Sequence, residues 1–157
     1  MIQIRRFETQ DGKAVKELIH QVMDGEFQEE KNAFSFDDLE TIGESYGHLG
    51  EAFFVAEEGK KIVGTIGVKR EDDRKALLRR MFVSPEHRKR KIGLELLNRA
   101  IEFCEEVGYS ELVLKTTSRM ADAIELVQKR GFQSRAKVPM GQVELMKFSL
   151  SLKGKKA

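Results

Sequence analysis

The sequence predicts a mixed α+β domain in which about seven strands form one mixed sheet flanked by about four helices. Two observations lead to this fold class. Apolar residues recur at every second position in some segments and with helical spacing in others. Three strand-like segments follow one another with only turns between them, which favours antiparallel pairing. A long helical segment then separates the fourth strand from the fifth, which is typical of a crossover connection.

Length and composition restrict the classes of protein to which the chain can belong. Its 157 residues suit a single domain, 1–152, followed by a short basic tail, 153–157, that we expect to be frayed. Hydrophobic residues make up 40% and charged residues 34%, which excludes a disordered chain and a membrane protein. The 28 Lys and Arg nearly balance the 26 Asp and Glu, so a functional positive charge must be local. The single Cys104 excludes an internal disulfide framework and favours a cytoplasmic location.

The N-terminal part predicts one strand and two helices. The apolar residues of the strand are Ile2, Ile4 and Phe7, and those of the first helix are Val15, Leu18, Ile19, Val22 and Met23. Asp11 is the expected N-cap of this helix and Gly25 its expected end. After a polar loop, 26–33, we expect a short helix over 36–42 with Ser35 as its cap.

The remaining elements alternate between strands and helices. Three consecutive strands are expected at Ala52–Ala56, Lys61–Lys69 and Ala76–Val83. The turns between them are expected at Glu57–Lys60 and Glu71–Arg74. They are followed by a helix at Ile92–Val107, a strand at Glu111–Thr116, a helix at Arg119–Arg130, a strand at Phe132–Val138, and a last strand containing Met146, Phe148, Leu150 and Leu152.

The most informative stretch is the passage from the fourth strand into the longest helix. A Pro-containing turn after Val83 leads into four basic residues, Arg88–Lys91, and the helix begins at Ile92. Unpaired N–H groups at a helix start, the positive end of the dipole and basic side chains together form an anion site, and a pyrophosphate is its natural occupant. Gly93 allows close approach of the backbone. Two other interpretations stay open, a solvated basic surface and a nucleic-acid site, although no other feature supports the second.

This stretch resembles the acetyl-CoA-binding motif of the GNAT superfamily of N-acetyltransferases. That motif is an Arg or Gln, two residues, a Gly, one residue, and a Gly or Ala. Arg88 takes its first position, Lys91 stands at its first glycine and Gly93 at its second. The passage Gly108–Leu114 and the pair Gly131-Phe132 also resemble the family, and the likeness spans nearly the whole chain.

The resemblance implies acetyl-CoA as a co-substrate, bound in the gap of a splayed sheet, and no metal. The backbone of the fourth strand would hold the pantetheine arm at Met81, Phe82 and Val83. The residues of the pyrophosphate cradle would be Arg88, Lys89, Arg90, Lys91, Ile92, Gly93 and Leu94. At Lys91 we expect helical backbone angles, so that its N–H donates and its ammonium adds charge. The alternative is that its side chain crowds the phosphates.

The chain departs from the family at the usual catalytic positions. Many relatives carry an Asn where Met120 stands and a general-acid Tyr where Val127 stands, and some carry a general-base Glu where Leu77 stands. The catalytic residues are therefore left unassigned. We expect proximity of amine and thioester to supply most of the acceleration, with a backbone N–H polarising the carbonyl and water accepting the proton.

Two residues are candidates for binding the acceptor. A period of two puts Leu77, Arg79 and Met81 on one side of the fourth strand, which in the resemblance faces the acceptor groove. Arg79 is expected either to pair with an acidic group of the acceptor or to form surface ion pairs. Tyr46 belongs to a region that covers the acceptor site in some relatives. It would line that site or act as an acid there, or else pack in the core.

Three further signals are weaker. The run Gly43–Gly47 fits G-x-S-x-G, but a helix instead of a strand is expected before it, so a nucleophile elbow is not expected. The three histidines are scattered along the chain, which argues against a metal site. Cys104 is expected on the inner side of the longest helix as a small buried apolar residue.

The sequence thus favours an acetyl-CoA-dependent N-acetyltransferase that acts on a primary amine of a small molecule or peptide. Direct transfer is expected because no nucleophile for a covalent intermediate is evident. The alternative is a non-catalytic acyl-CoA-binding or sensor module on the same fold, motivated by the missing Tyr, Asn and Glu. Neither nucleic acid nor a membrane is an expected partner. Such folds commonly dimerise through their last strands, so a homodimer is one expectation.

Overall fold

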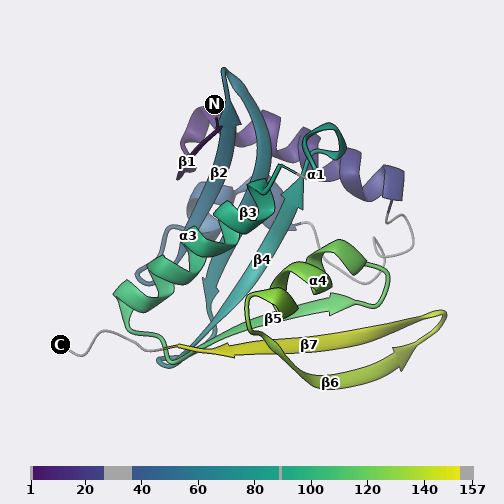
Figure 1. The fold of residues 1–157 in the computed structure, drawn as a ribbon. Coiled ribbons are helices and arrows are strands. Elements are labelled where there is room, and N and C mark those ends of the chain that lie inside the picture. Colours follow the sequence, from purple (N-terminus) through teal and green to yellow (C-terminus); the bar gives the residue numbers. More distant parts are fainter. Residues whose placement is uncertain (1, 27–36, 89, 153–157) are drawn as a thin grey trace.

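One mixed sheet organises the molecule, and helices cover both of its faces (Figure 1). The computed structural model describes residues 2–26, 37–88 and 90–152. The strands are β1 (Ile2–Arg6), β2 (Ala52–Glu58), β3 (Lys61–Arg70), β4 (Lys75–Val83), β5 (Glu111–Thr117), β6 (Gln133–Met140) and β7 (Val143–Ser151). They lie in the order β1-β2-β3-β4-β5-β7-β6, and only β4 and β5 pair in parallel. The predicted fold class is therefore confirmed, including the crossover between the fourth and fifth strands.

The helices divide the apolar residues between two cores. They are α1 (Gly12–Glu26), α2 (Ile42–Ser45), α3 (Ile92–Val107) and α4 (Ala121–Lys129), with 3₁₀ turns η1 (Thr9–Asp11), η3 (Asp37–Glu40) and η4 (Pro85–His87). Alternate residues of one strand face opposite layers: Phe54 packs with α3 and α4, whereas Phe53 and Val55 pack with α1 and α2. No helix in the described part of the chain is long and apolar enough to cross a membrane.

The predicted helix over 36–42 is replaced by two shorter pieces. In the described residues, η3 ends at Glu40 and α2 begins at Ile42, because Thr41 between them has non-helical backbone angles, with φ −137° and ψ 47°. Ser35 and Phe36 lie outside the described residues. The first helix also passes through Gly25, its expected end, and finishes one residue later.

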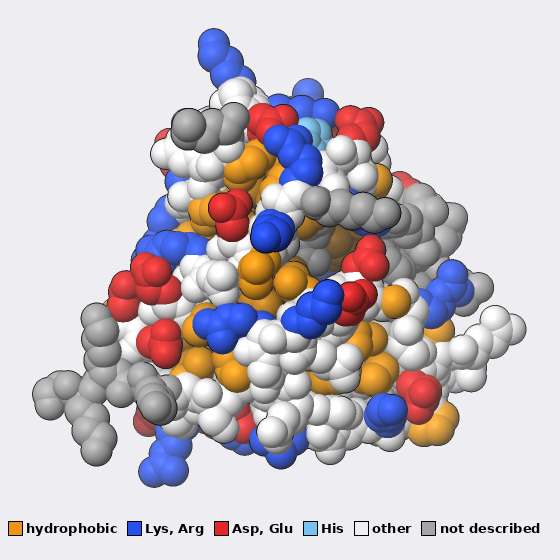
Figure 2. Space-filling view, in the orientation of Figure 1, with side chains coloured by type: hydrophobic (Ala, Val, Ile, Leu, Met, Phe, Trp, Pro, Cys, Tyr) orange, Lys and Arg blue, Asp and Glu red, His pale blue; other side chains and the backbone are white. Residues whose placement is uncertain are grey.

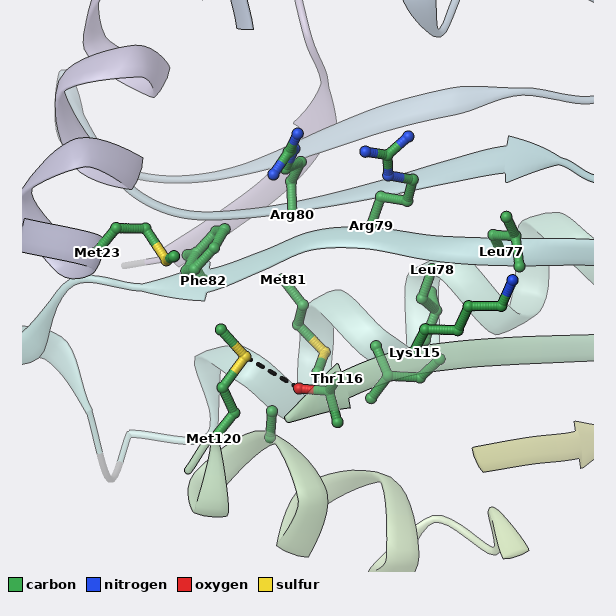
Figure 3. A pocket seen from close by; sticks show the side chains of 12 residues that line it. Met23, Leu77, Leu78, Arg79, Arg80, Met81, Phe82, Lys115, Thr116 and Met120 are labelled. Carbon is green, nitrogen blue, oxygen red and sulfur yellow. Dashed lines mark hydrogen bonds between the residues drawn. The ribbon is translucent and has the colours of Figure 1, made fainter. Parts of the chain in front are cut away.

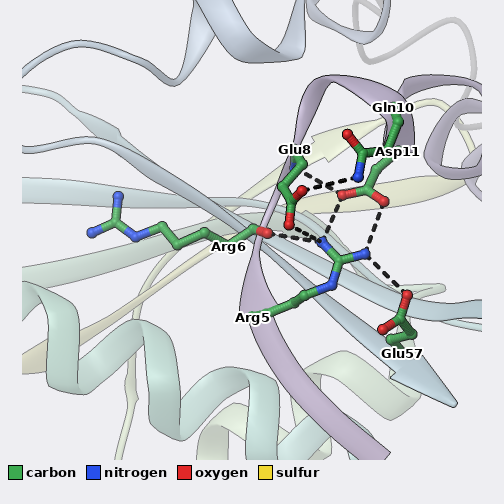
Figure 4. Close-up of polar contacts among 6 residues, drawn as sticks. All are labelled: Arg5, Arg6, Glu8, Gln10, Asp11 and Glu57. Atoms are coloured by element: carbon green, nitrogen blue, oxygen red, sulfur yellow. Dashed lines mark hydrogen bonds and ion pairs between the residues drawn. The ribbon is translucent and has the colours of Figure 1, made fainter. Parts of the chain in front are cut away.

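The start of α1 differs from the prediction as well (Figure 4). Asp11 is not an N-cap. It closes a 3₁₀ turn whose N-cap is Glu8, and its carboxylate accepts the Glu8 backbone N–H at 2.8 Å. Arg5 donates to both oxygens of Asp11, at 2.8 and 2.9 Å, and to Glu57 of β2 at 3.1 Å. The hydrogen bonds from Arg5 lower the pKa of Asp11. A partly buried group of ion pairs therefore fixes the helix start to β1 and β2.

We expect Cys104 to be unreactive in the folded protein. Its side chain is fully buried in the core beneath α3, as the sequence predicts, and burial raises the pKa of its thiol to about 12. Iodoacetamide at pH 8 should leave the mass of the native chain unchanged, whereas the chain unfolded in guanidinium chloride should gain one adduct. Labelling at the same rate in both states would show that Cys104 is accessible.

Candidate functional site

The parallel strands β4 and β5 separate partway along their length. Their pairing runs from Lys75 and Glu111 to Leu78 and Leu114, and the rest of both strands continues without it. A cavity of about 270 Å³ occupies the gap (Figure 3). Its lining residues are Met23, Leu77, Leu78, Arg79, Arg80, Met81, Phe82, Leu114, Lys115, Thr116, Met120 and Ala123. Because they come from both cores, the cavity passes between the two faces of the sheet.

A β-bulge in β4 redirects the side chains at this gap. Thr65 pairs with Phe82 and Gly67 with Arg79, so two β4 residues, Arg80 and Met81, face one residue of β3. Arg80 has a left-handed φ of +53°. Figure 3 shows Arg79, Arg80 and Phe82 on one side of β4 and Met81 on the other. The predicted grouping of Arg79 with Met81 is therefore wrong, because the extra residue shifts the alternation after Arg79.

The bulged residue Arg80 forms a buried cluster that the alternation of residues along β4 does not predict. Its Nε donates to Asp38 at 3.0 Å, a second guanidinium nitrogen donates to the other oxygen, and the Tyr46 hydroxyl donates to Asp38 at 2.6 Å. The side chains of Arg80 and Asp38 are only 6% and 12% exposed. Burial raises the pKa of Asp38, but hydrogen bonds from Arg80 and Tyr46 outweigh burial and lower it. The cluster joins η3 and α2 to the bulge.

The two acceptor-site candidates lie in different surroundings. Tyr46 is 4% exposed and is not among the described residues that line the cavity. Burial, together with the hydrogen bond to Asp38, raises the pKa of its hydroxyl, which therefore remains a donor. Arg79 does line the cavity and is half-buried. Its guanidinium makes no hydrogen bond with any residue that the structure describes, although its charge helps to lower the pKa of Asp38.

The described lining is mostly apolar, and its few polar side chains do not include the usual acids and bases of an acetyltransferase site. Its polar side chains are Arg79, Arg80, Lys115 and Thr116, with no carboxylate, histidine or tyrosine among the described lining residues. The Thr116 hydroxyl donates to the Met120 sulfur at 2.9 Å. Val127 is fully buried in the core. In the same described part of the chain, no three His, Cys, Asp or Glu side chains are grouped to hold a metal ion.

The start of α3 has unpaired donors and an unusual N-cap. Lys91 is the N-cap residue, with φ +62° and no capping by its side chain. The first helical bond runs from Glu95 N to Lys91 O at 3.0 Å, so the N–H groups of Ile92, Gly93 and Leu94 lack partners among the described residues. The expected helical angles at Lys91 are wrong. A left-handed residue is required here, which explains physically why the motif normally has glycine at this position.

Part of the basic run is engaged by the protein itself. Arg90 forms an ion pair with Glu58 of β2, and the His87 Nε2 lies 3.5 Å from the same carboxylate. The hydrogen bond from Arg90 lowers the pKa of Glu58. Arg88 donates from Nε to the Val83 carbonyl at 3.3 Å. Lys89 lies outside the described residues. Glu58 therefore neutralises part of the positive charge of the basic run, all of which the sequence alone would make available to a bound anion.

Two glycines set the packing around the start of α3. A Cβ on Gly93 would lie 3.2 Å from Leu126 of α4, so this glycine serves helix packing. A Cβ on Gly64 of β3 would lie 2.8 Å from Leu96 of α3. Figure 2 shows apolar side chains at the surface between α3 and α4, with both basic and acidic side chains around them.

Replacing Lys91 with glycine should stabilise the protein by about 0.5–1 kcal/mol. A non-glycine residue in left-handed conformation costs about 1–2 kcal/mol of stability. Glycine removes this cost, but its greater freedom in the unfolded chain offsets part of the gain. Urea unfolding followed by circular dichroism measures the change. Lys60→Gly is the matched control, because Lys60 is exposed and has no positive φ, and it should not stabilise. A Lys91→Gly variant no more stable than Lys60→Gly would contradict the strain at Lys91.

Comparison with known protein families gives one extended match. The model of the acetyltransferase (GNAT) family matches residues 16–132. Human N-acetyltransferase 8 is 34% identical over 102 residues, which cover 61% of this chain and 45% of the human protein. Rat N-acetyltransferase 8 is 37% identical over 102 residues, covering 61% of this chain and 46% of the rat protein. The chain thus spans about half the length of the curated relatives it matches.

Solved structures share this architecture over the whole chain. A GNAT-family acetyltransferase from Staphylococcus aureus Mu50 is 28% identical, with a TM-score of 0.85 over 98% of this chain and 100% of the other. YncA from Salmonella typhimurium, solved with its cofactor acetyl-CoA, is 22% identical, with a TM-score of 0.80 over 99% of this chain and 96% of the other. At that lower identity, the second likeness concerns the fold alone.

Proposed function

The chain belongs to the acetyltransferase (GNAT) family, and on this basis we propose that it transfers the acetyl group of acetyl-CoA directly to a primary amine of a small molecule or peptide. The observation that carries the proposal is the cavity at the β4–β5 gap. It is lined by the end of β4, the strand that leads through η4 to the unpaired N–H groups of α3. Strand β4 would therefore connect the site of acetyl transfer with the site that binds the phosphates.

The cofactor contacts follow from this connection. The backbone of Met81–Val83 would pair with the pantetheine arm, since β5 has left that edge of β4. The N–H groups at 92–94 would bind the pyrophosphate, with Arg88, Lys89, Arg90 and Lys91 around it. Arg90 would then exchange Glu58 for a phosphate. The unpaired donors fit such a group without rearrangement of the helix.

The residues of the chain would act mainly by placing the amine against the thioester. The described lining residues include no carboxylate, histidine or tyrosine to act as a general acid or base, and proximity alone can provide about 7–11 kcal/mol of barrier reduction. Backbone N–H groups of β4 beyond Leu78 are available to polarise the thioester carbonyl, because β5 no longer pairs there. Water in the open part of the gap would accept the proton of the amine.

Acetyl-CoA binding tests the cofactor assignment. We expect calorimetry to show binding, and we expect Lys91→Glu to weaken it about tenfold by placing a negative charge at the helix start. Lys137→Glu, on the far edge strand β6, is the charge-matched control and should bind like the wild type. Absence of acetyl-CoA binding at about 1 mM ligand would exclude the proposal, since cellular co-substrates act at or below this range.

The second candidate function is an acyl-CoA sensor without turnover, which the lining without an acid or base favours. CoA release in the presence of a panel of amines and peptides separates the two functions. Release with any acceptor excludes the sensor, while tight acetyl-CoA binding without release from the whole panel supports it.

The remaining assignments concern the wider setting of the chain. We propose a single domain over 1–152, a cytoplasmic location and a homodimer through the last strands. The single buried cysteine supports a reducing compartment. Strand β6, the outermost strand of the sheet, is exposed over nearly all of its length, which supports pairing with a second copy. Sedimentation velocity at several concentrations tests the dimer, and a monomer throughout would exclude it.

A further inference from the structure

We propose that Arg79 binds a carboxylate of the acceptor, and that the acceptor is an α-amino acid or close analogue with an apolar side chain. This inference rests on the proposed transfer to an amine and names the class of amine. It depends on three properties of the cavity: its charge, the place of Arg79 in the strand, and the character of the remaining lining.

The charged side chains of the described lining are all positive. They are Arg79, Arg80 and Lys115. Arg80 is neutralised by Asp38 within the protein, and Lys115 is 58% exposed with Glu71 at 3.8 Å. Arg79 differs, because its half-buried guanidinium makes no hydrogen bond to the part of the chain that the structure describes. The planar guanidinium of an arginine has paired N–H donors that can form a bidentate hydrogen bond with a carboxylate.

The position of Arg79 fits an amine next to the carboxylate. Leu78 is the last residue of β4 that pairs with β5, so Arg79 is the first residue beyond the point where the gap opens. The bulge begins at the next residue, and the Arg80–Asp38 pair fixes it. A carboxylate held by Arg79 leaves an amine one carbon away, at the mouth of the gap. That is where the thioester is expected, so one ion pair would both select and orient the acceptor.

The remainder of the lining fits one apolar substituent. Three methionines, Met23, Met81 and Met120, line the cavity together with Phe82. Methionine side chains adapt to ligands of different shape, which suits a range of apolar side chains. A volume of about 270 Å³ is just below the range of typical ligand pockets, about 300–1,000 Å³, and suits a small acceptor. The positive lining disfavours polyamines, because a second ammonium would face Arg79.

Acceptor selectivity provides the kinetic test. CoA release would be measured with leucine, leucinamide, 3-methylbutylamine and spermidine. We expect kcat/KM for leucine to exceed that for each of the others by about 10- to 100-fold, the usual effect of a hydrogen-bonded charge pair. Arg79→Gln should remove this preference, by lowering kcat/KM for leucine to about the value for leucinamide. Lys75→Gln is the control, because it removes a positive charge from the same strand outside the cavity. Equal rates for leucine and leucinamide would overturn the proposal.

An equilibrium measurement separates failure of this inference from failure of the proposed function. Calorimetry with the CoA-loaded protein would compare N-acetyl-leucine with N-acetyl-leucinamide in the wild type and in Arg79→Gln. Carboxylate-dependent binding that Arg79→Gln abolishes, without CoA release from any amine, would support the site and contradict the transferase. Turnover of amines without preference for a carboxylate would support the transferase and contradict the site. Absence of N-acetyl-leucine binding also overturns the inference.

Discussion

Replacing Asp38 with alanine is expected to lower the free energy of unfolding by about 3–5 kcal/mol, because it removes one partner from a buried ion pair. Arg80 would keep its charge with 6% of its side chain exposed, and the buried Tyr46 hydroxyl would lose its acceptor. Arg80 also has a left-handed φ, so the same carboxylate holds the strained residue of the bulge. Urea unfolding at pH 7 measures the loss.

Three variants show whether the loss comes from the uncompensated charge. Asp38→Asn keeps an acceptor oxygen and should lose less than Asp38→Ala. The double variant Asp38→Ala/Arg80→Met removes both charges and should recover part of the stability. Glu40→Ala, in the same 3₁₀ turn, breaks an exposed ion pair with Lys16 and should cost less than about 1 kcal/mol. If Asp38→Ala costs no more than Glu40→Ala, the buried pair does not stabilise the bulge.

The pH dependence gives an independent check on Asp38. Its pKa is lowered in the folded state, so its stabilising effect is fully present above the unfolded pKa of about 3.9 and is lost as the pH falls through the folded value. The stability difference between the wild type and Asp38→Ala should therefore be constant from about pH 5 to 7 and shrink below about pH 4. A difference that shrinks already near pH 6 would show that Asp38 does not have a lowered pKa.

Periodicity predicts the fold well because each element buries one face. Strands such as β2 alternate between the two cores, and the spacing of the longest helix keeps Leu96, Ala100 and Cys104 inside. Boundaries near polar segments are less predictable. Asp11 has the residue type of an N-cap, but its carboxylate binds Arg5, which also binds Glu57 of β2, and these contacts anchor the helix. Such a choice depends on tertiary contacts that local sequence does not contain.

The site is predicted in outline, and its details depend on backbone irregularities. The basic helix start is evident from Arg88–Lys91, yet neither the left-handed Lys91 nor the bulge at Arg80 has a glycine to indicate it. The bulge changes which side chains of β4 share a face. Periodicity in the sequence therefore could not predict that Arg80 pairs with Asp38, which lies 42 residues away. Likewise, the sequence contains Glu58 and Arg90, but it does not indicate that they form an ion pair. Pairings across the sheet carry this information.

Gly64→Val is expected to destabilise the protein by about 1–3 kcal/mol and to weaken acetyl-CoA binding about tenfold. A Cβ at this position of β3 would lie 2.8 Å from the Leu96 Cδ1, 3.3 Å from the Ile92 Cγ2 and 3.2 Å from the Phe82 carbonyl oxygen. Ile92 and Leu96 are buried and the carbonyl belongs to β4, so neither side has free space. The added methyls must therefore push the start of α3 away from the sheet.

The effect on binding follows from the same displacement. The N–H groups at 92–94 are aligned with the end of β4 only while Gly64 lets α3 lie directly on β3. Calorimetry with acetyl-CoA and urea unfolding would be carried out on Gly64→Val and on Gly43→Ala, whose added Cβ meets no atom within 4 Å. The control should match the wild type in affinity and be as stable or slightly more stable, since alanine reduces the freedom of the unfolded chain. Wild-type affinity in a destabilised Gly64→Val would mean that the close contact between α3 and β3 supports the core but not the cofactor.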